Sequence, residues 1–348
     1  MRSWIEVSRS AIRDNFRAVK ASVGPSIEVM PVVKADAYRH GAVEVSRILE
    51  AEGAQWLAVS SVEEGVTLRE SGIAARILVM ADYLPENRSF FKDFQLTPVI
   101  HSLEDISTAE VPYHLKIDSG MGRLGVRESP EDIARAVKST PLEGLMTHFA
   151  SSANYESPQT EQQIARFESV IKTVGAPRYV HLSSTIPVAY QRTAAWGNLV
   201  RPGHAIYGYV SPARGGPAMQ LHVKPALTWK AIVLSVKDLE AGAQIGYGGI
   251  YRAPKPMRIA ILAAGYADGI PHRLSNRGKV MANGNPVSIL GAVSMDLTTI
   301  EAADLRVGDI VTLLGPGNDA QEIARVAGTI SYSVLCGISA RVKRVFVD

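Results

Sequence analysis

Residues 27–201 alternate short apolar runs with stretches of helical spacing, and this alternation restricts the fold more than any other feature. The runs expected to form buried strands are residues 27–33, 56–59, 76–80, 96–100, 113–117, 145–149, 179–182 and 199–201. Helical spacing of apolar residues occurs between most of them, for example over 43–51, 62–71, 130–138 and 159–173. Alternating β and α units predict a parallel sheet. Eight such units in about 200 residues favour a closed (β/α)8 barrel of the TIM type, an α/β fold, over an open sheet.

The sequence changes character near residue 226. Strands are expected over 231–236, 258–262, 287–290 and 310–314, separated by Gly, Pro and Asn turns. Asn283-Gly284 is a strong hairpin signal, and one short helix is expected near 320–328. These features predict two domains, a barrel over 8–225 and a C-terminal all-β domain over 226–348. Residues 1–7 are expected to add a strand to the β domain.

Composition excludes several classes of protein. The chain has 348 residues, of which 46% are hydrophobic, and this is enough for a large barrel and a second domain. The net charge of +3 is diffuse, without the basic and aromatic runs typical of nucleic-acid binding. No apolar stretch is long enough to span a membrane, and the N-terminus shows no apolar signal region, so we expect a cytoplasmic protein.

Cysteine and histidine usage argues against disulfides and metal sites. Cys336 is the only cysteine, which excludes an internal disulfide and a Cys-rich zinc site. The eight histidines show no metal-ligand spacing. We therefore expect no metal.

The first expected strand ends on a lysine, in the stretch Val32-Val33-Lys34-Ala35-Asp36-Ala37-Tyr38. The pKa of a lysine held in a dry pocket falls from about 10.4 towards neutrality. A neutral amine can form a Schiff base with an aldehyde cofactor. The alternative is a lysine that leaves the core for solvent, and this stretch alone does not decide between the two.

Other polar residues also lie at expected strand ends. Together with Lys34 they are Lys116, Arg123, His148, His181 and Arg201. One polar residue at a strand end is usually structural. Because the chemistry of TIM barrels takes place at the C-terminal ends of their strands, several such residues favour a functional site.

Two motifs suggest that anions bind near these strand ends. Gly120-Met121-Gly122-Arg123-Leu124-Gly125 matches the dinucleotide pattern GxGxxG, but it lies in the fifth unit and no helix follows closely. We interpret its glycines as turn residues around Arg123, which could hold a substrate carboxylate or could be an ordinary surface arginine.

Arg201-Pro202-Gly203-His204 and the pair Ser184-Thr185 form the second motif. They follow the last two expected barrel strands, where phosphate sites often occur. Ordinary turn chemistry and helix capping by Ser184 are equally open at this point.

Tyr247 lies among glycines in Gly246-Tyr247-Gly248-Gly249 of the expected β domain. The glycines could expose the phenol at a cleft, or the tyrosine could belong to the core at a bulge. Tyr266 and Tyr332 leave the same choice open. The nucleophile elbow GxSxG and the zinc helix HExxH are both absent from the sequence.

Taken together, these segments resemble the alanine racemase family, whose members are pyridoxal-phosphate (PLP) enzymes of fold type III. The matching segments, in the family's order, are VVKADAY (32–38), KIDSGMGRLG (116–125), THFA (147–150), VRPG (200–203), IGYGGIY (245–251), GYADG (265–269), SMD (294–296) and SYSVLC (331–336). The resemblance implies a PLP-binding barrel, a C-terminal β domain and a homodimer with shared active sites. It also implies an isomerase that interconverts L- and D-alanine and so supplies D-alanine for peptidoglycan.

The resemblance also implies a role for each matching residue. Lys34 resembles the lysine that carries the cofactor and is one catalytic base, and Tyr247 resembles the second base, contributed by the partner subunit. Arg201 matches the arginine facing the pyridine nitrogen, and His148 matches the histidine beneath the ring. The other cofactor positions are Tyr38, Ser184, Thr185, Gly203, His204 and Tyr332. Arg123 and Met295 match the substrate-carboxylate site, Lys116 matches a lysine that is carbamylated in many members, and Tyr266 and Asp296 match wall and entrance positions.

The implied roles agree with elementary chemistry. Two bases on opposite faces can remove the α-proton and return it on the other side, while PLP spreads the developing negative charge into its ring. Arginine does not give up its proton, so an arginine against the ring nitrogen leaves that nitrogen largely unprotonated. We expect this arrangement to limit transamination. Tyrosine ordinarily titrates near pH 10, so a tyrosine base needs positive charge nearby, which His148 with Arg201 could supply.

Some positions depart from the family pattern. Arg39 replaces a common glycine, Ser184 a common asparagine and Ala292 a usual arginine, and 151–154 also differs. A serine or broader amino-acid racemase, a non-catalytic PLP carrier and a decarboxylase of the same fold type are the alternatives. A carrier lacks the β domain, and Cys336 is in the wrong context for the decarboxylase. Substrate range and the modification state of Lys116 stay open.

Overall fold

The computed structural model describes residues 1–302 and 304–348. The chain forms two compact units. The barrel unit contains residues 10–37 and 41–224, and the β unit contains residues 1–9, 38–40 and 225–348. Each unit is described by itself.

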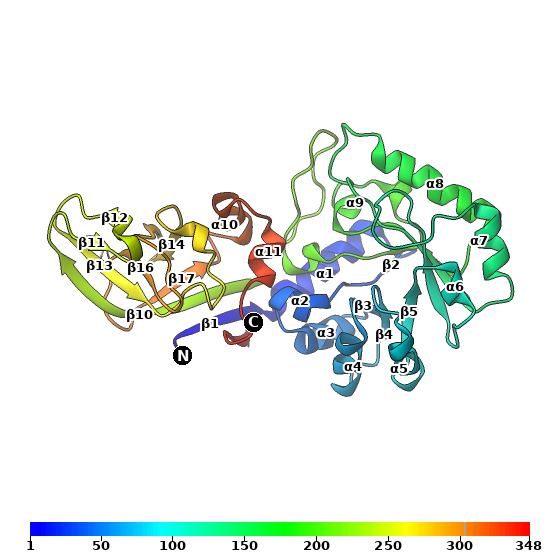
Figure 1. The fold of residues 1–348 in the computed structure, drawn as a ribbon, viewed down its shortest axis with the longest axis horizontal. Helices are drawn as coiled ribbons and strands as arrows, with labels where there is room; N and C mark the ends of the chain where they lie inside the picture. Colours follow the sequence, from blue (N-terminus) through cyan, green and yellow to red (C-terminus); the bar gives the residue numbers. More distant parts are fainter. Residues whose placement is uncertain (303) are drawn as a thin grey trace. The chain divides into compact units, whose positions relative to one another are not determined.

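Eight parallel strands form the wall of the barrel unit, and Figure 1 labels the first four of them. They are β2 (Glu28–Val29), β3 (Trp56–Val59), β4 (Arg76–Val79), β5 (Leu96–Ile100), β6 (Tyr113–Lys116), β7 (Leu142–Met146), β8 (Tyr179–His181) and β9 (Leu199–Val200). Strands β3 to β8 pair in sequence order, and β2 pairs with β9. A bridge between Val32 and Ala58 joins β2 to β3. A hydrogen bond of 3.0 Å from the Arg201 N–H to the Ser183 carbonyl joins β9 to β8, so the strands close.

Helices connect the strands, as the alternating pattern predicts. They are α1 (Arg9–Val23), α2 (Lys34–Arg39), α3 (Ala42–Ala51), α4 (Val62–Glu70), α5 (Arg88–Asp93), α6 (Leu103–Ile106), α7 (Pro130–Val137), α8 (Gln159–Val174) and α9 (Thr185–Ala189). In α1 the buried residues Ile12, Phe16, Val19 and Val23 recur at helical spacing. Ser61 and Ser129 accept backbone N–H groups at the starts of α4 and α7 and cap them. No helix in the described part of the chain is long and apolar enough to cross a membrane.

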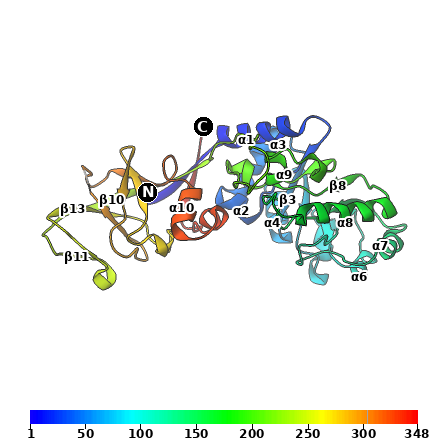
Figure 2. The same ribbon diagram turned by 90° about the horizontal axis from the view of Figure 1, so that it is seen from above.

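The β unit is built around one long strand, β10 (Leu227–Leu239), shown with β11 and β13 in Figure 2. The other strands are β1 (Ser3–Ser8), β11 (Gln244–Ile245), β12 (Tyr251–Arg252), β13 (Met257–Leu262), β14 (Lys279–Ala282), β15 (Asn285–Ser288), β16 (Thr298–Glu301), β17 (Ile310–Leu314) and β18 (Lys343–Val347). Strand β10 pairs with β1, β13 and β17. Strand β1 lies between β10 and β18, antiparallel to the first and parallel to the second.

Two short helices complete the β unit. Helix α10 (Ala320–Ala327) was expected, and Asp319 caps it by accepting two backbone N–H groups. Helix α11 (Ser331–Cys336) was not expected, and it contains Tyr332. Asn283 and Gly284 both have positive φ and join β14 to β15, so the hairpin signal is confirmed.

The barrel prediction is confirmed, and its errors concern the ends of elements. The strand expected over 145–149 is Leu142–Met146, so His148 lies beyond its end. The strand expected over 27–33 has only two paired residues, and its continuation to Val33 is held by single bonds. The polar residue Glu143 lies inside β7, so the run of apolar residues did not mark where this strand begins.

Candidate active site

Four cationic or imidazole groups gather at the C-terminal ends of the barrel strands. Lys34 directly follows Val33, whose N–H bonds to the Ala58 carbonyl at 2.8 Å. Lys116 is the last residue of β6 and is 6% exposed. Arg201 directly follows β9, and His148 lies two residues past β7. The structure therefore brings these predicted site residues to one end of the barrel.

The segment that carries Lys34 has an unusual backbone. In α2 the five residues from Ala35 to Arg39 have φ between +52° and +67°, so the helix is left-handed. None of these residues is glycine, and each left-handed non-glycine residue costs roughly 1–2 kcal/mol. Such strain persists only where the surroundings over-determine it, which is typical of functional sites.

Hydrogen bonds from neighbouring segments hold α2 in this conformation. Asp36 accepts the Gly41 N–H at its carbonyl (3.0 Å) and the Ala42 N–H at Oδ1 (2.8 Å). The Glu64 carboxylate accepts the Ala35 N–H at 2.6 Å and the Ser60 N–H at 2.7 Å. Glu64 thereby ties the residue after Lys34 to the end of β3.

Glu64 was missed in the sequence, although Ser61 and Glu64 have capping-box spacing. Ser61 Oγ does accept the Glu64 N–H, at 3.4 Å. The reciprocal bond of a capping box would join Glu64 to the Ser61 N–H. Here the Glu64 carboxylate instead accepts the Ser60 and Ala35 N–H groups. The capping-box spacing therefore marked the start of a helix, but it did not show that Glu64 positions the segment after Lys34.

Arg201 is a buried cation, 2% exposed. Nη1 donates to Nδ1 and the carbonyl of His181, both at 2.8 Å, and Nη2 donates to the Thr147 carbonyl at 2.7 Å. Burial lowers the pKa of Arg201 to about 9, so it is charged at neutral pH. No carboxylate lies within salt-bridge distance of it among the described residues.

Burial and nearby positive charge lower the pKa values of His148 and Lys116. Burial and then Arg201 lower the pKa of His148 to about 3, which leaves the imidazole neutral. Its Nδ1 lies 3.5 Å from Arg201 Nη2. Burial is the main cause of the lowered pKa of Lys116. The positive charges of Arg123, Arg201 and Lys34 lower this pKa further, to about 8. Part of the Lys116 population is therefore the neutral amine near pH 7.5.

His101 is a second residue that the sequence did not reveal. It follows β5, and the register of Ile100 with Leu115 places it beside Lys116. Neither ring nitrogen has a hydrogen bond of ordinary geometry, and both are buried. Burial and then Lys116 lower its pKa to about 4. A lone histidine after an apolar run gives no signal that separates this position from a core histidine.

The segments predicted to bind phosphate lie close together. Thr185 Oγ1 accepts the N–H groups of Gly203 and Ala205, both at 3.2 Å. His204 is buried and its ring stacks on Tyr209, with centroids 5.1 Å apart. Ser184 precedes α9 without a side-chain cap bond, so the capping alternative is wrong.

The glycine-rich loop does not bind a dinucleotide through its backbone. The Asp118 carboxylate accepts the N–H groups of Gly120, Met121 and Gly122, and so occupies the donors that a pyrophosphate would need. Gly125 has φ +118°, and a Cβ there would lie 2.7 Å from the Asp118 nitrogen. The loop therefore folds on Asp118, and it presents Arg123 as an exposed side chain.

In the β unit, Tyr247 is 78% exposed. It begins the short 3-10 helix η4 (Tyr247–Gly249), and Gly246 and Gly248 beside it both have positive φ. The alternative of a core tyrosine is therefore wrong. Met295 and Tyr266 are also exposed, at 54% and 43%.

The turns that carry Tyr266 and Met295 are bonded to each other. The N–H of Tyr266 donates to the Ser294 carbonyl, and the N–H of Ala267 donates to the Met295 carbonyl. Arg341 donates to Asp268 and to Asp296, each at 2.7 Å. The structure therefore brings Tyr266, Met295 and Asp296 into one cluster.

Tyr38 and Tyr332 contact each other within the β unit, with ring centroids 5.9 Å apart. Burial raises the pKa of Tyr332 to about 12, and burial followed by Tyr332 raises that of Tyr38. Both phenols are neutral at physiological pH. They are therefore hydrogen-bond donors suited to an anion.

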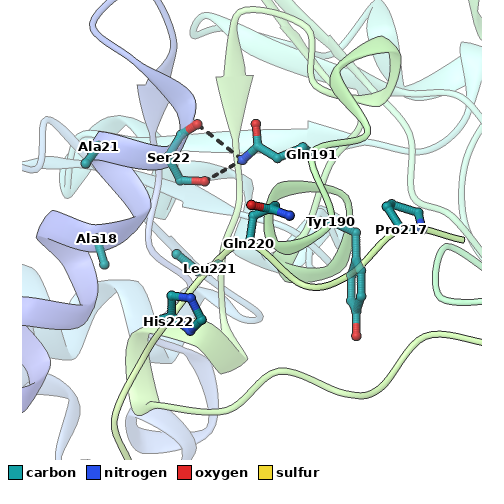
Figure 3. Close-up of a pocket in the computed structure, with 9 residues that line it drawn as sticks. All are labelled: Ala18, Ala21, Ser22, Tyr190, Gln191, Pro217, Gln220, Leu221 and His222. Carbon is teal, nitrogen blue, oxygen red and sulfur yellow. Dashed lines mark hydrogen bonds between the residues drawn. The ribbon is translucent and has the colours of Figure 1, made fainter.

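A groove lies elsewhere on the barrel unit (Figure 3). Its volume is about 790 Å³, and it is lined by Ala18, Ala21, Ser22, Tyr190, Gln191, Pro217, Gln220, Leu221 and His222. Gln191 Nε2 donates to Ser22 Oγ at 2.7 Å across it. Ser22 lies in the last turn of α1 and Gln191 lies two residues after α9, and these helices precede β2 and β9, so the groove lies at the N-terminal ends of strands. Its described lining includes none of the predicted site residues.

The barrel site fits an anionic cofactor. Lys34, Lys116, Arg123 and Arg201 place positive charge at one end of the strands, and Asp118 is already engaged by its loop and by Arg127 at 3.0 Å. An anion there would offset the mutual repulsion of these cations. The residues present therefore match a phosphate-bearing aldehyde held near a lysine.

Comparison with known proteins identifies the family. Models for the N-terminal and C-terminal domains of alanine racemase match residues 7–212 and 226–346. The chain belongs to the alanine racemase family.

Individual alanine racemases resemble it over their whole length. The alanine racemase of Carboxydothermus hydrogenoformans is 40% identical, with 99% of each chain covered. The solved alanine racemase from Bacillus anthracis with bound L-Ala-P has a TM-score of 0.92 at 32% identity, covering 100% of this chain and 95% of that one. The enzyme from Bartonella henselae, solved with covalently bound pyridoxal phosphate, has a TM-score of 0.91 at 25% identity, with 100% of both chains covered.

The left-handed helix leads to a first prediction. Replacing Ala35, which is exposed and has φ +54°, with glycine removes the Cβ that strains this conformation. Glycine also makes the unfolded chain more flexible, so we expect Ala35→Gly to change the free energy of unfolding by only about −0.5 to +1 kcal/mol. The matched control Ala21→Gly, exposed in right-handed α1, should lose about 1 kcal/mol. Denaturant unfolding would contradict this prediction if both variants lost equal stability.

Lys116 leads to a second prediction. Because its pKa falls from 10.5 to about 8, its charged form is disfavoured in the folded protein. The resulting loss of stability, up to about 3 kcal/mol, is complete below pH 8 and disappears as the pH rises to 10.5. In bicarbonate-free buffer, cofactor-free Lys116→Met should therefore be more stable than the parent at pH 7, and the difference should shrink above pH 8.

Exposed Lys138→Met is the control for this measurement. Its stability relative to the parent should show no comparable change between pH 7 and pH 10. A Lys116→Met advantage that grew with pH would contradict the proposed cause.

Proposed function

We propose that this chain is a PLP-dependent alanine racemase whose two catalytic bases are Lys34 and Tyr247. The positions of Lys34 and Tyr247 in the structure support this most strongly. Lys34 lies among the cations at the C-terminal ends of the barrel strands, and Tyr247 is 78% exposed on the β unit, where a core tyrosine would be buried. The family's established activity, interconversion of L- and D-alanine for peptidoglycan, fits both.

The residues proposed to hold the cofactor are those predicted from the sequence. Lys34 would be the point of attachment, and Arg201 and His148 would contact the ring. Tyr38, Ser184, Thr185, Gly203, His204 and Tyr332 are the proposed phosphate contacts. The neutral phenols of Tyr38 and Tyr332 and the paired bonds of Thr185 support these roles.

The protein's own groups move and hold the protons. PLP, when bound, supplies an electron sink for the charge that develops at the substrate α-carbon. On one face the Lys34 amine takes up the α-proton or its ammonium form delivers it, and on the other face the Tyr247 phenolate takes it up or the phenol delivers it. Two bases on opposite faces invert the centre without rotating the substrate.

Arg201 donates hydrogen bonds and retains its proton, since its pKa of about 9 keeps it charged at neutral pH. Against a ring nitrogen, such a donor would give a hydrogen bond without transferring a proton. The same positive charge helps a nearby tyrosine act as a base.

Arg123 and Met295 are proposed to hold the substrate carboxylate, with Lys116 as a brace for the arginine. Arg123 is exposed on its loop and makes no salt bridge among residues 1–302 and 304–348, so it is available to a ligand. The neutral fraction of Lys116 is the form that can be carbamylated. Tyr266 and Asp296 are proposed to form the wall and entrance of the site.

A homodimer with shared sites is part of the proposal. The β unit exposes Tyr247, Ile250, Tyr266, Met295 and Leu297, all of them large apolar or aromatic side chains. An exposed group of this kind fits self-association through a symmetric interface. We also propose a cytoplasmic location, supported by the absence of any possible internal disulfide in a chain with Cys336 alone.

A third prediction concerns the second base. Tyr247→Phe removes only the hydroxyl, so alanine racemisation should fall by about 10³-fold or more, as expected for loss of a proton-transfer group. The visible absorbance of the cofactor attached at Lys34 should persist. Assays with D- and L-alanine, serine and lysine would also define the substrate range. Unchanged turnover would refute the two-base assignment.

A fourth prediction tests whether the sites are shared. Lys34→Ala and Tyr247→Phe are each expected to be inactive. After unfolding and refolding together, half of the dimers should be mixed, and each mixed dimer should contain one site with both native bases. Activity should therefore return to about one quarter of the parent value. If Tyr247 acted within its own subunit, no site would be complete and the mixture would stay inactive.

A further inference from the structure

A chain of polar side chains runs through the interior of the barrel unit, starting at Arg201. Arg201 Nη1 donates to His181 Nδ1 at 2.8 Å, and His181 Nε2 lies 2.7 Å from His114 Nδ1. His114 Nε2 lies 3.9 Å from Glu143 Oε2, which is beyond hydrogen-bond distance, and it has no hydrogen-bond partner among the described residues. Arg76 closes the chain with two bonds to Glu143, at 2.8 and 2.5 Å.

The chain extends from one end of the barrel to the other. Arg201 follows the C-terminal end of β9, whereas Arg76 is the first residue of β4. His181 and His114, both 0% exposed, lie between them on β8 and β6. The interiors of TIM barrels are usually filled by branched apolar side chains, so two histidines here require a reason.

The donors and acceptors determine where each proton lies. Burial lowers the pKa of His114 to about 3 and that of His181 well below its ordinary value, so both rings are neutral and each carries one N–H. Arginine only donates, so His181 Nδ1 must accept and His181 Nε2 must carry the proton. That proton is donated to His114 Nδ1. The His114 proton therefore lies on Nε2, facing Glu143.

The surroundings of His114 leave its ring one position. A Cβ at Gly144 on the neighbouring strand would lie 2.7 Å from His114 Cγ and Nδ1, so the ring occupies space that only glycine leaves. The rings of Trp56 and Tyr179 pack against it at centroid distances of 5.4 and 5.7 Å. The Arg76 guanidinium lies over the Trp56 ring, with its Cζ 3.9 Å from the ring centroid.

Stability alone does not explain this arrangement. A buried polar network is at best comparable with well-packed apolar side chains, and each member adds a desolvation penalty. The chain ends on the one buried cation that the proposed function places against the cofactor. His181 holds Nη1 of that cation, and the Thr147 and Leu182 carbonyls hold Nη2 at 2.7 and 3.2 Å. The orientation of the guanidinium plane thus depends on which nitrogen of His181 is free to accept.

We propose that His114 is a positioning residue for racemisation: by accepting the Nε2 proton of His181 it reinforces the tautomer that the bond from Arg201 requires, and thereby helps to hold the orientation of Arg201. The functional part of this inference rests on the proposed function. The proton arrangement itself does not, and the two can be tested separately.

The first experiment measures the tautomers directly. Nitrogen-15 NMR of the purified holoenzyme labelled at histidine should show His181 and His114 as neutral rings with the proton on Nε2 across pH 6–9. His114→Phe should change the His181 signals, because its Nε2 proton loses its acceptor. A wild-type His181 protonated on Nδ1, or on both nitrogens, would overturn the proposal whatever the enzyme's activity.

The second experiment separates positioning from packing. We expect His114→Phe to lower kcat about 10- to 100-fold and to leave KM within about threefold, since misplacing a catalytic group by a fraction of an ångström has effects of this size. It should also shift the visible absorbance of the bound cofactor. His114→Gln, whose amide oxygen can accept from His181 and whose NH2 can face Glu143, should recover most of the lost kcat.

Val99→Ala is the matched control. Val99 is fully buried in β5, in register with His114, and outside the polar chain. Its variant should unfold more readily yet retain kcat within about threefold of the parent and an unshifted absorbance. If His114→Phe and Val99→Ala had the same kcat and absorbance, His114 would be merely structural. If His114→Phe failed to fold, the wild-type tautomers and the Gln variant would still decide, whereas a wild type without racemase activity would refute the proposed function alone.

Discussion

Burial of the Arg201 charge without an opposite charge is the constraint on which the site depends. A lone guanidinium in a protein interior is tolerable only when oriented dipoles replace the lost water. Here the carbonyls of Thr147, His181 and Leu182 do so, and they come from the C-terminal ends of β7 and β8 and the residues directly after them. Adjacent parallel strands that end at the same level supply such carbonyls together, so the closed barrel makes this buried cation possible.

Lys34 illustrates the complementary problem of placing a flexible side chain. Lysine has a long stem, and a catalytic amine has to be held within a fraction of an ångström. The structure restricts the amine by holding the residues that follow Lys34 in a left-handed turn. Hydrogen bonds to Asp36 and Glu64 restrain this turn. Strain in one short segment is thereby balanced by ordinary hydrogen bonds from a rigid strand and a capped helix.

The sequence predicted the architecture because hydrophobic periodicity is a direct consequence of burial. Eight apolar runs marked the strands, and Asn283-Gly284 marked a hairpin by its need for positive φ. The left-handed α2 could not be foreseen, since Ala35, Asp36 and Ala37 all favour right-handed geometry and only tertiary bonds reverse it. His114 was equally hidden, because a single histidine in an apolar strand looks like any core residue until its neighbours are known.

The position of β1 has a consequence for the order of events during synthesis. This first strand lies between β10 and β18 and is parallel to β18, whose residues 343–347 are made almost a full chain length later. The edge of β1 that pairs with β18 therefore stays unpaired until translation of the chain is nearly complete. The barrel unit, by contrast, has all its strands by residue 200. A nascent chain would therefore contain a complete set of barrel strands while one edge of β1 is still unpaired. An exposed strand edge of this kind can bind chaperones or a second copy of the chain.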